Sequence, residues 1–165
     1  YGMQRAVFEE RVPPSSYATF AEWAEATQRY QASVLRHHIE TLRRLKYRPT
    51  GGFCFFQLAD AQPSISWGVL DHQRRPKLAY DAVVEACRPV IVVADPLPTQ
   101  VSPGDPIALA LHVVSDLRRS VGAATITARL SWTNGEHVWR FGGVPCGRRS
   151  FRAPDSRPCN STGGL

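Results

Sequence analysis

Polar and aromatic residues follow a short apolar run near the middle of the chain. The run begins after Gly51-Gly52 and ends at Leu58. At its end and beyond it lie two amides (Gln57 and Gln62), two carboxylates (Asp60 and Asp71) and one indole (Trp67). Amide and carboxylate groups can hydrogen-bond hydroxyl groups, while an indole offers a flat apolar surface. Such a set placed at a strand end is typical of the carboxyl-terminal mouth of a parallel barrel. The chemistry it favours is the binding of a sugar.

Two helices and one strand are expected to position these side chains. Thr19 with Glu22 forms a capping box, and apolar residues recur at helical spacing until about Lys46, which predicts a long first helix. The run from Phe53 to Leu58 has no polar alternation, as in a buried parallel strand. Pro76 suits the first turn of a second helix over residues 77–87. Its expected inward residues are Leu78, Val83, Val84 and Cys87.

These motifs resemble the end of the catalytic barrel in glycoside hydrolase family 2, on its β-mannosidase-like side. The resemblance covers residues 17–95 and extends more loosely to about residue 140. Phe56 stands where the family usually has a sugar-stacking Trp, Ala59 replaces an Asn, and Gln62 replaces a second Trp. The matching stretches are Phe56-Gln57-Leu58-Ala59-Asp60-Ala61-Gln62-Pro63, Ser66-Trp67, Asp71 and Arg75-Pro76-Lys77-Leu78-Ala79-Tyr80.

The resemblance implies an α/β fold joined to an all-β part. Residues 1–88 would be the last strand and helices of a (β/α)8 barrel, and residues 89–143 a partial immunoglobulin-like β-sandwich. The implied parent is a retaining exo-glycosidase acting on β-mannosides or related glycosides. Such enzymes use two carboxyl groups about 5 Å apart, which are both Glu in this family. Tyr1-Gly2 resembles the end of the nucleophile motif, so no catalytic residue is predicted within this chain.

Four residues are predicted to contribute to substrate binding in the parent. Phe56 could stack on a sugar ring, and Trp67 could form an apolar wall, although a core position for Trp67 is an equal alternative. Asp60 could hydrogen-bond sugar hydroxyls, or it could hold a neighbouring Arg or cap a turn. Gln57 lies within an apolar run and needs partners if it is buried. Support of the site is therefore the expected role of Gln57.

The second half of the chain changes from helical to strand periodicity. Short strands are expected over residues 90–94, 107–113, 124–130 and 138–141, with a hairpin turn at Asn134-Gly135. Their number falls short of a full sandwich. Residues 144–165 lack periodicity and are rich in Arg, Pro, Ser and Gly. This composition predicts a disordered tail or a frameshifted one.

Composition limits the other functions. The formal net charge is +6, but the arginine pairs lie in unrelated segments without interleaved aromatic residues, which argues against nucleic-acid binding. No signal peptide and no membrane-spanning run are predicted within these residues. Cys54 and Cys87 are expected to be buried, and no His or Cys spacing indicates a metal site. No cofactor is predicted. The alternative function is a non-catalytic β-sandwich module that binds carbohydrate or protein.

Overall fold

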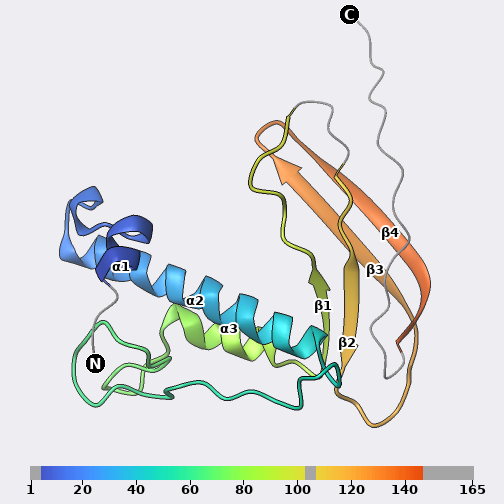
Figure 1. The fold of residues 1–165 in the computed structure, drawn as a ribbon, viewed down its shortest axis with the longest axis horizontal. Helices are drawn as coiled ribbons and strands as arrows, with labels where there is room; N and C mark the ends of the chain where they lie inside the picture. The colour runs from blue at the N-terminus through green and yellow to red at the C-terminus, as the bar shows by residue number, and fades with distance from the viewer. Residues whose placement is uncertain (1–4, 103–106, 147–165) are drawn as a thin grey trace, which may run out of the picture. The chain divides into compact units, whose positions relative to one another are not determined.

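The computed structural model describes residues 5–102 and 107–146, with only the backbone described for residues 143–146. The chain divides into two compact units, Tyr1–Arg88 and Pro89–Leu165. The described part of the first unit contains helices and loops, and that of the second contains strands (Figure 1). Tyr1-Gly2 and the expected tail beyond residue 146 lie outside the described residues.

The N-terminal segment forms the short helix α1 (Arg5–Arg11) and a 3-10 turn at Pro14–Ser16. Arg5 and Glu9 form an ion pair one helical turn apart at 2.7 Å, which supports this helix. The ring of Phe8 also packs edge-on against Trp23, with centroids 6.0 Å apart. This packing joins α1 to a residue of the next helix.

The long helix α2 (Phe20–Arg44) begins at the predicted capping box. The Thr19 hydroxyl accepts a hydrogen bond from the Glu22 N–H at 3.2 Å, and the Glu22 carboxylate accepts one from the Ala18 N–H at 3.0 Å. Both bonds satisfy backbone donors that a helix start leaves without partners.

Helix α3 (Leu78–Ala86) runs parallel to α2. Its first N–H, from Leu78, donates to the Gln28 side chain at 3.3 Å, and its last carbonyl, from Ala86, accepts from Arg43 at 2.5 Å. The loop between the helices returns from the end of α2 to the start of α3 (Figure 1). Two parallel helices with a return segment between them are typical of repeating β/α units.

The packed face of α3 differs from the expected one. Its buried residues are Ala79, Ala82 and Ala86, while Leu78 and Val84 are 42% and 46% exposed. Small side chains let the two helix backbones approach, so α2 packs on alanines. Cys87 follows the buried Ala86 and leaves the packed face, so it is exposed rather than buried.

The strand expected over Phe53–Leu58 is not formed. These residues have no ladder partner, and only isolated bridges occur nearby, such as the one between Ala59 and Leu70. A parallel strand needs neighbouring strands for its backbone hydrogen bonds, and no described segment supplies them. Cys54, expected in the core, is exposed for the same reason.

The second unit has two antiparallel pairs of strands, compatible with a partial β-sandwich. Strand β1 (Val90–Ala94) lies as predicted and pairs with β2 (Leu111–Ser115), which begins four residues later than expected. Strands β3 (Val121–Trp132) and β4 (Gly135–Cys146) form the predicted hairpin. The turn residues are Thr133 and Asn134 instead of the expected Asn134 and Gly135, because Trp132 pairs with Gly135. The Trp132 ring lies against Gly135, where a Cβ would approach it to 2.9 Å. Residues 144–146, which were expected to belong to the tail, are part of β4.

The core of the second unit lies between Val113 of β2 and Ile126 of β3. Beside it is a hollow of about 200 Å³. Its lining contains no titratable side chain, and the polar side chains in it are Thr125 and Thr127. The lining residues are Val90, Val92, Val113, Val121, Ala124, Thr125, Ile126 and Thr127.

Candidate functional site

The predicted site residues lie on and beside a closed loop, residues 60–70, which we call the Trp67 loop. Backbone hydrogen bonds close its base: the Asp60 N–H donates to the Leu70 carbonyl at 3.0 Å, and the Val69 and Leu70 N–H groups donate to the Leu58 carbonyl at 3.1 and 2.9 Å. The Lys77 N–H donates to the Val69 carbonyl at 2.9 Å. The loop is thus joined to the residue that precedes α3.

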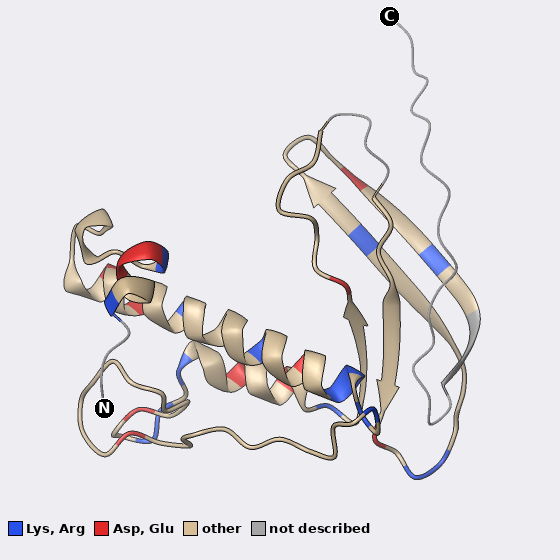
Figure 2. Ribbon diagram, in the orientation of Figure 1, with Lys and Arg blue, Asp and Glu red and all other residues tan. Residues whose placement is uncertain are grey.

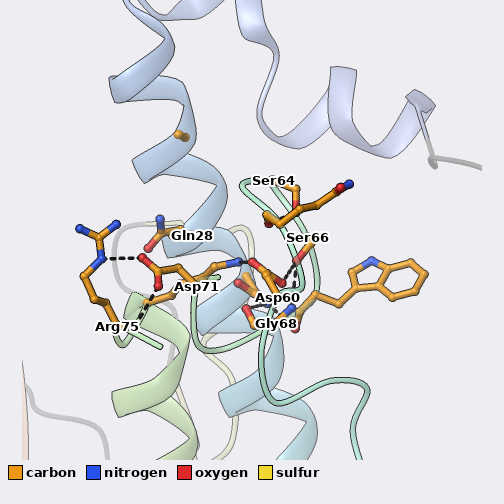
Figure 3. Close-up of polar contacts among 12 residues, drawn as sticks. Gln28, Asp60, Ser64, Ser66, Gly68, Asp71 and Arg75 are labelled. Atoms are coloured by element: carbon orange, nitrogen blue, oxygen red, sulfur yellow. Dashed lines mark hydrogen bonds and ion pairs between the residues drawn. The ribbon is translucent and has the colours of Figure 1, made fainter. Parts of the chain in front are cut away.

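A buried ion pair lies at the base of the Trp67 loop. Asp60 is only 2% exposed, and its Oδ2 lies 2.5 Å from Nζ of Lys77, whose side chain is 7% exposed. The Ser66 hydroxyl donates a hydrogen bond to the other carboxylate oxygen, Oδ1 (Figure 3). Among the described residues, Oδ2 accepts no hydrogen bond of good geometry. The Lys77 ammonium is therefore what compensates the burial of this oxygen.

The electrostatic surroundings favour the ionised form of Asp60. Burial alone raises the pKa of this carboxyl, but the contacts with Lys77 and Ser66 and the Gly68 N–H outweigh it. The pKa of Asp60 therefore lies below its ordinary value of 3.8, and the group carries its charge at neutral pH. A carboxylate held in this way does not act as a proton donor near pH 7.

Gly68 is required by the close approach of this carboxylate. A Cβ on Gly68 would lie 2.9 Å from Cγ of Asp60 and closer still to Oδ1. Gly68 itself is buried. A larger residue could be accepted only if the carboxylate moved away from Ser66 and Lys77.

Two aromatic rings meet at the surface beside this base. Trp67 is 53% exposed and Phe56 is 67% exposed, and their rings pack edge to face with centroids 5.8 Å apart. Gln31 of α2 donates from Nε2 to the Trp67 carbonyl at 2.9 Å and to the Gly68 carbonyl at 3.3 Å. The backbone of Trp67 is therefore held by α2 while its ring faces solvent. Such a pair offers a flat apolar surface to a ligand.

The structure brings Phe56, Asp60 and Trp67 together but gives them different surroundings. Both aromatic rings are exposed, whereas both oxygens of Asp60 are engaged within the protein. Asp60 holds a lysine and a serine, and Arg74 contacts only its carbonyl, at 3.3 Å. Gln57 is half-buried beside Phe56.

Several residues of the base were not singled out from the sequence. In the sequence, Ser66 and Lys77 stand out only as parts of the family-like stretches, and no pattern indicates a role for Gly68. Their contacts with Asp60 span six to seventeen positions, which no periodic pattern reveals. The available signal is that Ser66 lies in the same family-like stretch as Trp67, and Lys77 in a separate family-like stretch at residues 75–80.

A second, exposed ion pair shapes the turn before α3. The Asp71 carboxylate accepts hydrogen bonds from the Gln73 and Arg75 N–H groups at 2.8 and 2.9 Å, and from Arg75 Nε at 2.7 Å (Figure 3). Desolvation raises the pKa of Asp71, but the bonds from Arg75 and Gln73 bring it below its ordinary value. All of these contacts are local to the turn.

The second unit carries a row of rings along one face of its hairpin. Strand alternation and the pairing of Leu130 with His137 and of Trp132 with Gly135 place the row on a single face. Trp132 is 56% exposed, and the rings of His137 and Trp139 lie 4.3 Å apart. The members of this aromatic row are Trp132, His137, Trp139 and Phe141.

Other kinds of site find little support in the described ranges. Within residues 5–102 and 107–146 no three His, Cys, Asp or Glu side chains gather as metal ligands would. No described helix is both long and apolar enough to cross a membrane.

Comparison with known proteins identifies the relatives of this chain. Beta-mannosidase A of Emericella nidulans is 29% identical over 136 residues, which are 80% of this chain and 14% of that protein. Beta-mannosidase B of Aspergillus niger is 33% identical over 96 residues, which are 55% of this chain and 11% of that protein. No family model matches the chain.

A solved structure has the same fold. The crystal structure of β-D-mannosidase from Dictyoglomus thermophilum superimposes with a TM-score of 0.62 and 21% sequence identity, over 84% of this chain and 16% of that one. The resemblance to β-mannosidases is therefore confirmed, and the origin of the chain is glycoside hydrolase-like. The chain spans between 11% and 14% of the length of the curated relatives it matches.

Proposed function

We propose that this chain is a segment of a retaining exo-glycosidase of the β-mannosidase-like type, and that it supplies one wall of the sugar site. The observation that carries this proposal is the exposed pair of Phe56 and Trp67, held beside a buried ion pair, in a chain related to β-mannosidases. Phe56 and Trp67 would contact the apolar face of a sugar ring, Gln57 would support them, and Asp60 would act through its hold on the loop.

The barrel part of the proposal is supported by the helices. Helices α2 and α3 run parallel with a return segment between them, as consecutive helices of a (β/α)8 barrel do. The exposed side of α3 is apolar at Leu78 and Val84, and Phe53 and Leu58 of the return segment are 37% and 61% exposed. Large exposed apolar residues of this kind favour packing partners beyond the described residues. The second unit would correspond to the start of an immunoglobulin-like domain.

The chain is proposed to lack both catalytic Glu residues. Glu9 and Glu10 lie on α1, where each forms an exposed ion pair with an Arg at 2.7 and 3.1 Å. Glu22 is engaged at the start of α2. These are the contacts of solvated helix charges, and nothing in them resembles the pair of carboxyl groups that retaining glycosidases need.

A non-catalytic binding module remains the second candidate, because the aromatic row on the hairpin ends in Trp132, which is 56% exposed, while the other members of the row are half-buried. In that case the second unit would bind carbohydrate or protein. The two candidates place the working tryptophan in different units, at Trp67 or at Trp132. The two indoles are matched in exposure, at 53% and 56%.

The test is saturation-transfer NMR with methyl β-D-mannoside as the probe and the full chain as the receptor. We expect the sugar protons to receive saturation from the wild-type chain and from Trp132→Ala, but not from Trp67→Ala. Circular dichroism would check that both variants keep their secondary structure. Loss of transfer in Trp132→Ala alone would favour the module, and no transfer to any of the three chains would contradict both candidates.

A further inference from the structure

We infer that the buried Asp60–Lys77 pair is a positioning device that fixes Trp67, so that the indole is preorganised for a sugar ring. The purpose of this device rests on the proposed function, whereas its geometry does not depend on any ligand. Asp60 and Lys77 are positioning residues, since neither side chain is exposed enough to meet a ligand: the whole residues are 2% and 8% exposed.

The contacts lead from Lys77 to both neighbours of Trp67. The Lys77 ammonium holds Oδ2 of Asp60, while Oδ1 accepts from the Ser66 hydroxyl and occupies the space that a Cβ on Gly68 would need. The Gly68 N–H also contacts this carboxylate. The Gly68 N–H in turn donates to the Ser66 hydroxyl at 3.2 Å. The residues before and after Trp67 are therefore bound to the same carboxylate.

Trp67 is only partly buried. More than half of the residue is exposed, and its ring meets Phe56 edge-on at the surface. A shift of the Trp67 backbone therefore moves the indole with it. Holding a binding side chain in its bound position before the ligand arrives reduces the ordering cost of binding.

An ion pair at this position is better explained by geometry than by stability. A buried pair roughly balances its desolvation cost, and apolar residues of similar volume often serve the fold as well. The base of the loop is already closed by backbone hydrogen bonds at Leu58, Asp60 and Leu70. What the pair adds is a fixed direction for the Asp60 carboxylate, and with it a fixed position for Ser66 and Gly68.

The neighbouring Asp71–Arg75 pair provides a matched control. Its two charges are 2.7 Å apart, and their side chains are 21% and 68% exposed. It belongs to the same junction between the loop and α3, but its contacts stay within the turn. Removing it takes away an ion pair without releasing Ser66 or Gly68.

The experiment follows Trp67 by fluorine NMR of the full chain grown with fluorotryptophan. The chain has four Trp residues, and the Trp67 resonance is assigned from its loss in Trp67→Phe. The variants are Lys77→Met, the neutral double variant Asp60→Asn with Lys77→Met, and the control Arg75→Met. Methyl β-D-mannoside is then added to each chain.

We expect Lys77→Met and the double variant to shift or broaden the Trp67 resonance, while the other three stay in place. Arg75→Met should leave all four unchanged. A double variant that keeps its fold and leaves the Trp67 resonance at its wild-type position would overturn the inference. If the pair fixes Trp67 but the sugar moves no resonance in the wild-type chain, the proposed function fails and the positioning device stands.

Discussion

At the scale of single residues, Asp60 determines the local geometry of the candidate site. Its carboxylate bonds Ser66, pairs with Lys77 and excludes any side chain at Gly68. The sequence indicated Asp60 and left open whether it contacts sugar or holds its neighbours. Its burial favours the second role, because a group that is 2% exposed has no free face for a ligand. The pairing with Lys77 could not be foreseen, since it joins residues of two different local structures.

The lowered pKa of Asp60 predicts a loss of stability in acid. Because the folded-state pKa lies below the ordinary 3.8, the stabilisation is complete above that value and is lost as the pH falls through the folded-state pKa. We expect the free energy of unfolding of the first unit to decline below about pH 4. This decline can be measured by urea unfolding at a series of pH values, with the helix signal in circular dichroism as the readout.

Asp60→Asn should remove part of this acid dependence, because an amide does not titrate. Asp71→Asn serves as the control for the exposed carboxylate of the adjacent turn, whose pKa is also lowered. An unchanged acid slope in Asp60→Asn would show that the buried pair contributes nothing to it.

At the scale of elements, features that depend on neighbours in sequence could be predicted, and features that depend on distant parts of the chain could not. The capping box set the start of α2, and a compact run of β-branched residues gave β1 its bounds, because both depend on neighbours in sequence. The strand over residues 53–58 and the inward face of α3 depend on partners elsewhere. The apolar run over residues 53–58 forms no strand because it has no partner strand to hydrogen-bond among the described residues. The alanines of α3 are buried because α2 packs against them.

The alanine face of α3 leads to a test of helix packing. Ala79 is 0% exposed, and Ala79→Leu should force the helices apart at a cost of about 1–3 kcal/mol. Val84→Leu adds a methylene at a position that is 46% exposed on the same helix, and should change stability by less than about 0.5 kcal/mol. Urea denaturation of the two variants gives both values. Equal effects would mean that α3 does not pack through its alanines.

At the scale of the whole molecule, the chain consists of two units with different contents. Acidic and basic residues are interspersed along the helices of the first unit, while most of the described strand residues of the second are uncharged (Figure 2). The helical unit holds Phe56 and the Trp67 loop, and the strand unit holds the aromatic row. The two units meet where Arg88-Pro89 follows the end of a helix and the periodicity of the sequence changes.

The isolated chain should not hydrolyse glycosides. Two positioned carboxyl groups supply the chemistry of retaining enzymes, and the proposed segment contains neither of them. Purified chain incubated with aryl β-mannoside, β-glucoside and β-galactoside should release no more product than buffer. Turnover that disappears in Glu9→Ala or Glu10→Ala would show that the carboxylates lie in this chain and that the segment proposal is wrong.

The most direct measurement of the central claim is made on the longer enzyme in which this segment is proposed to lie. If the Trp67 ring forms a wall of the sugar site, Trp67→Ala should lower kcat/KM for an aryl β-mannoside at least about tenfold, equivalent to roughly 1.4 kcal/mol. Trp132→Ala, with matched exposure in the other unit, should stay within about twofold of wild type. Wild-type kcat/KM in Trp67→Ala, with the fold intact by its melting curve, would contradict the account.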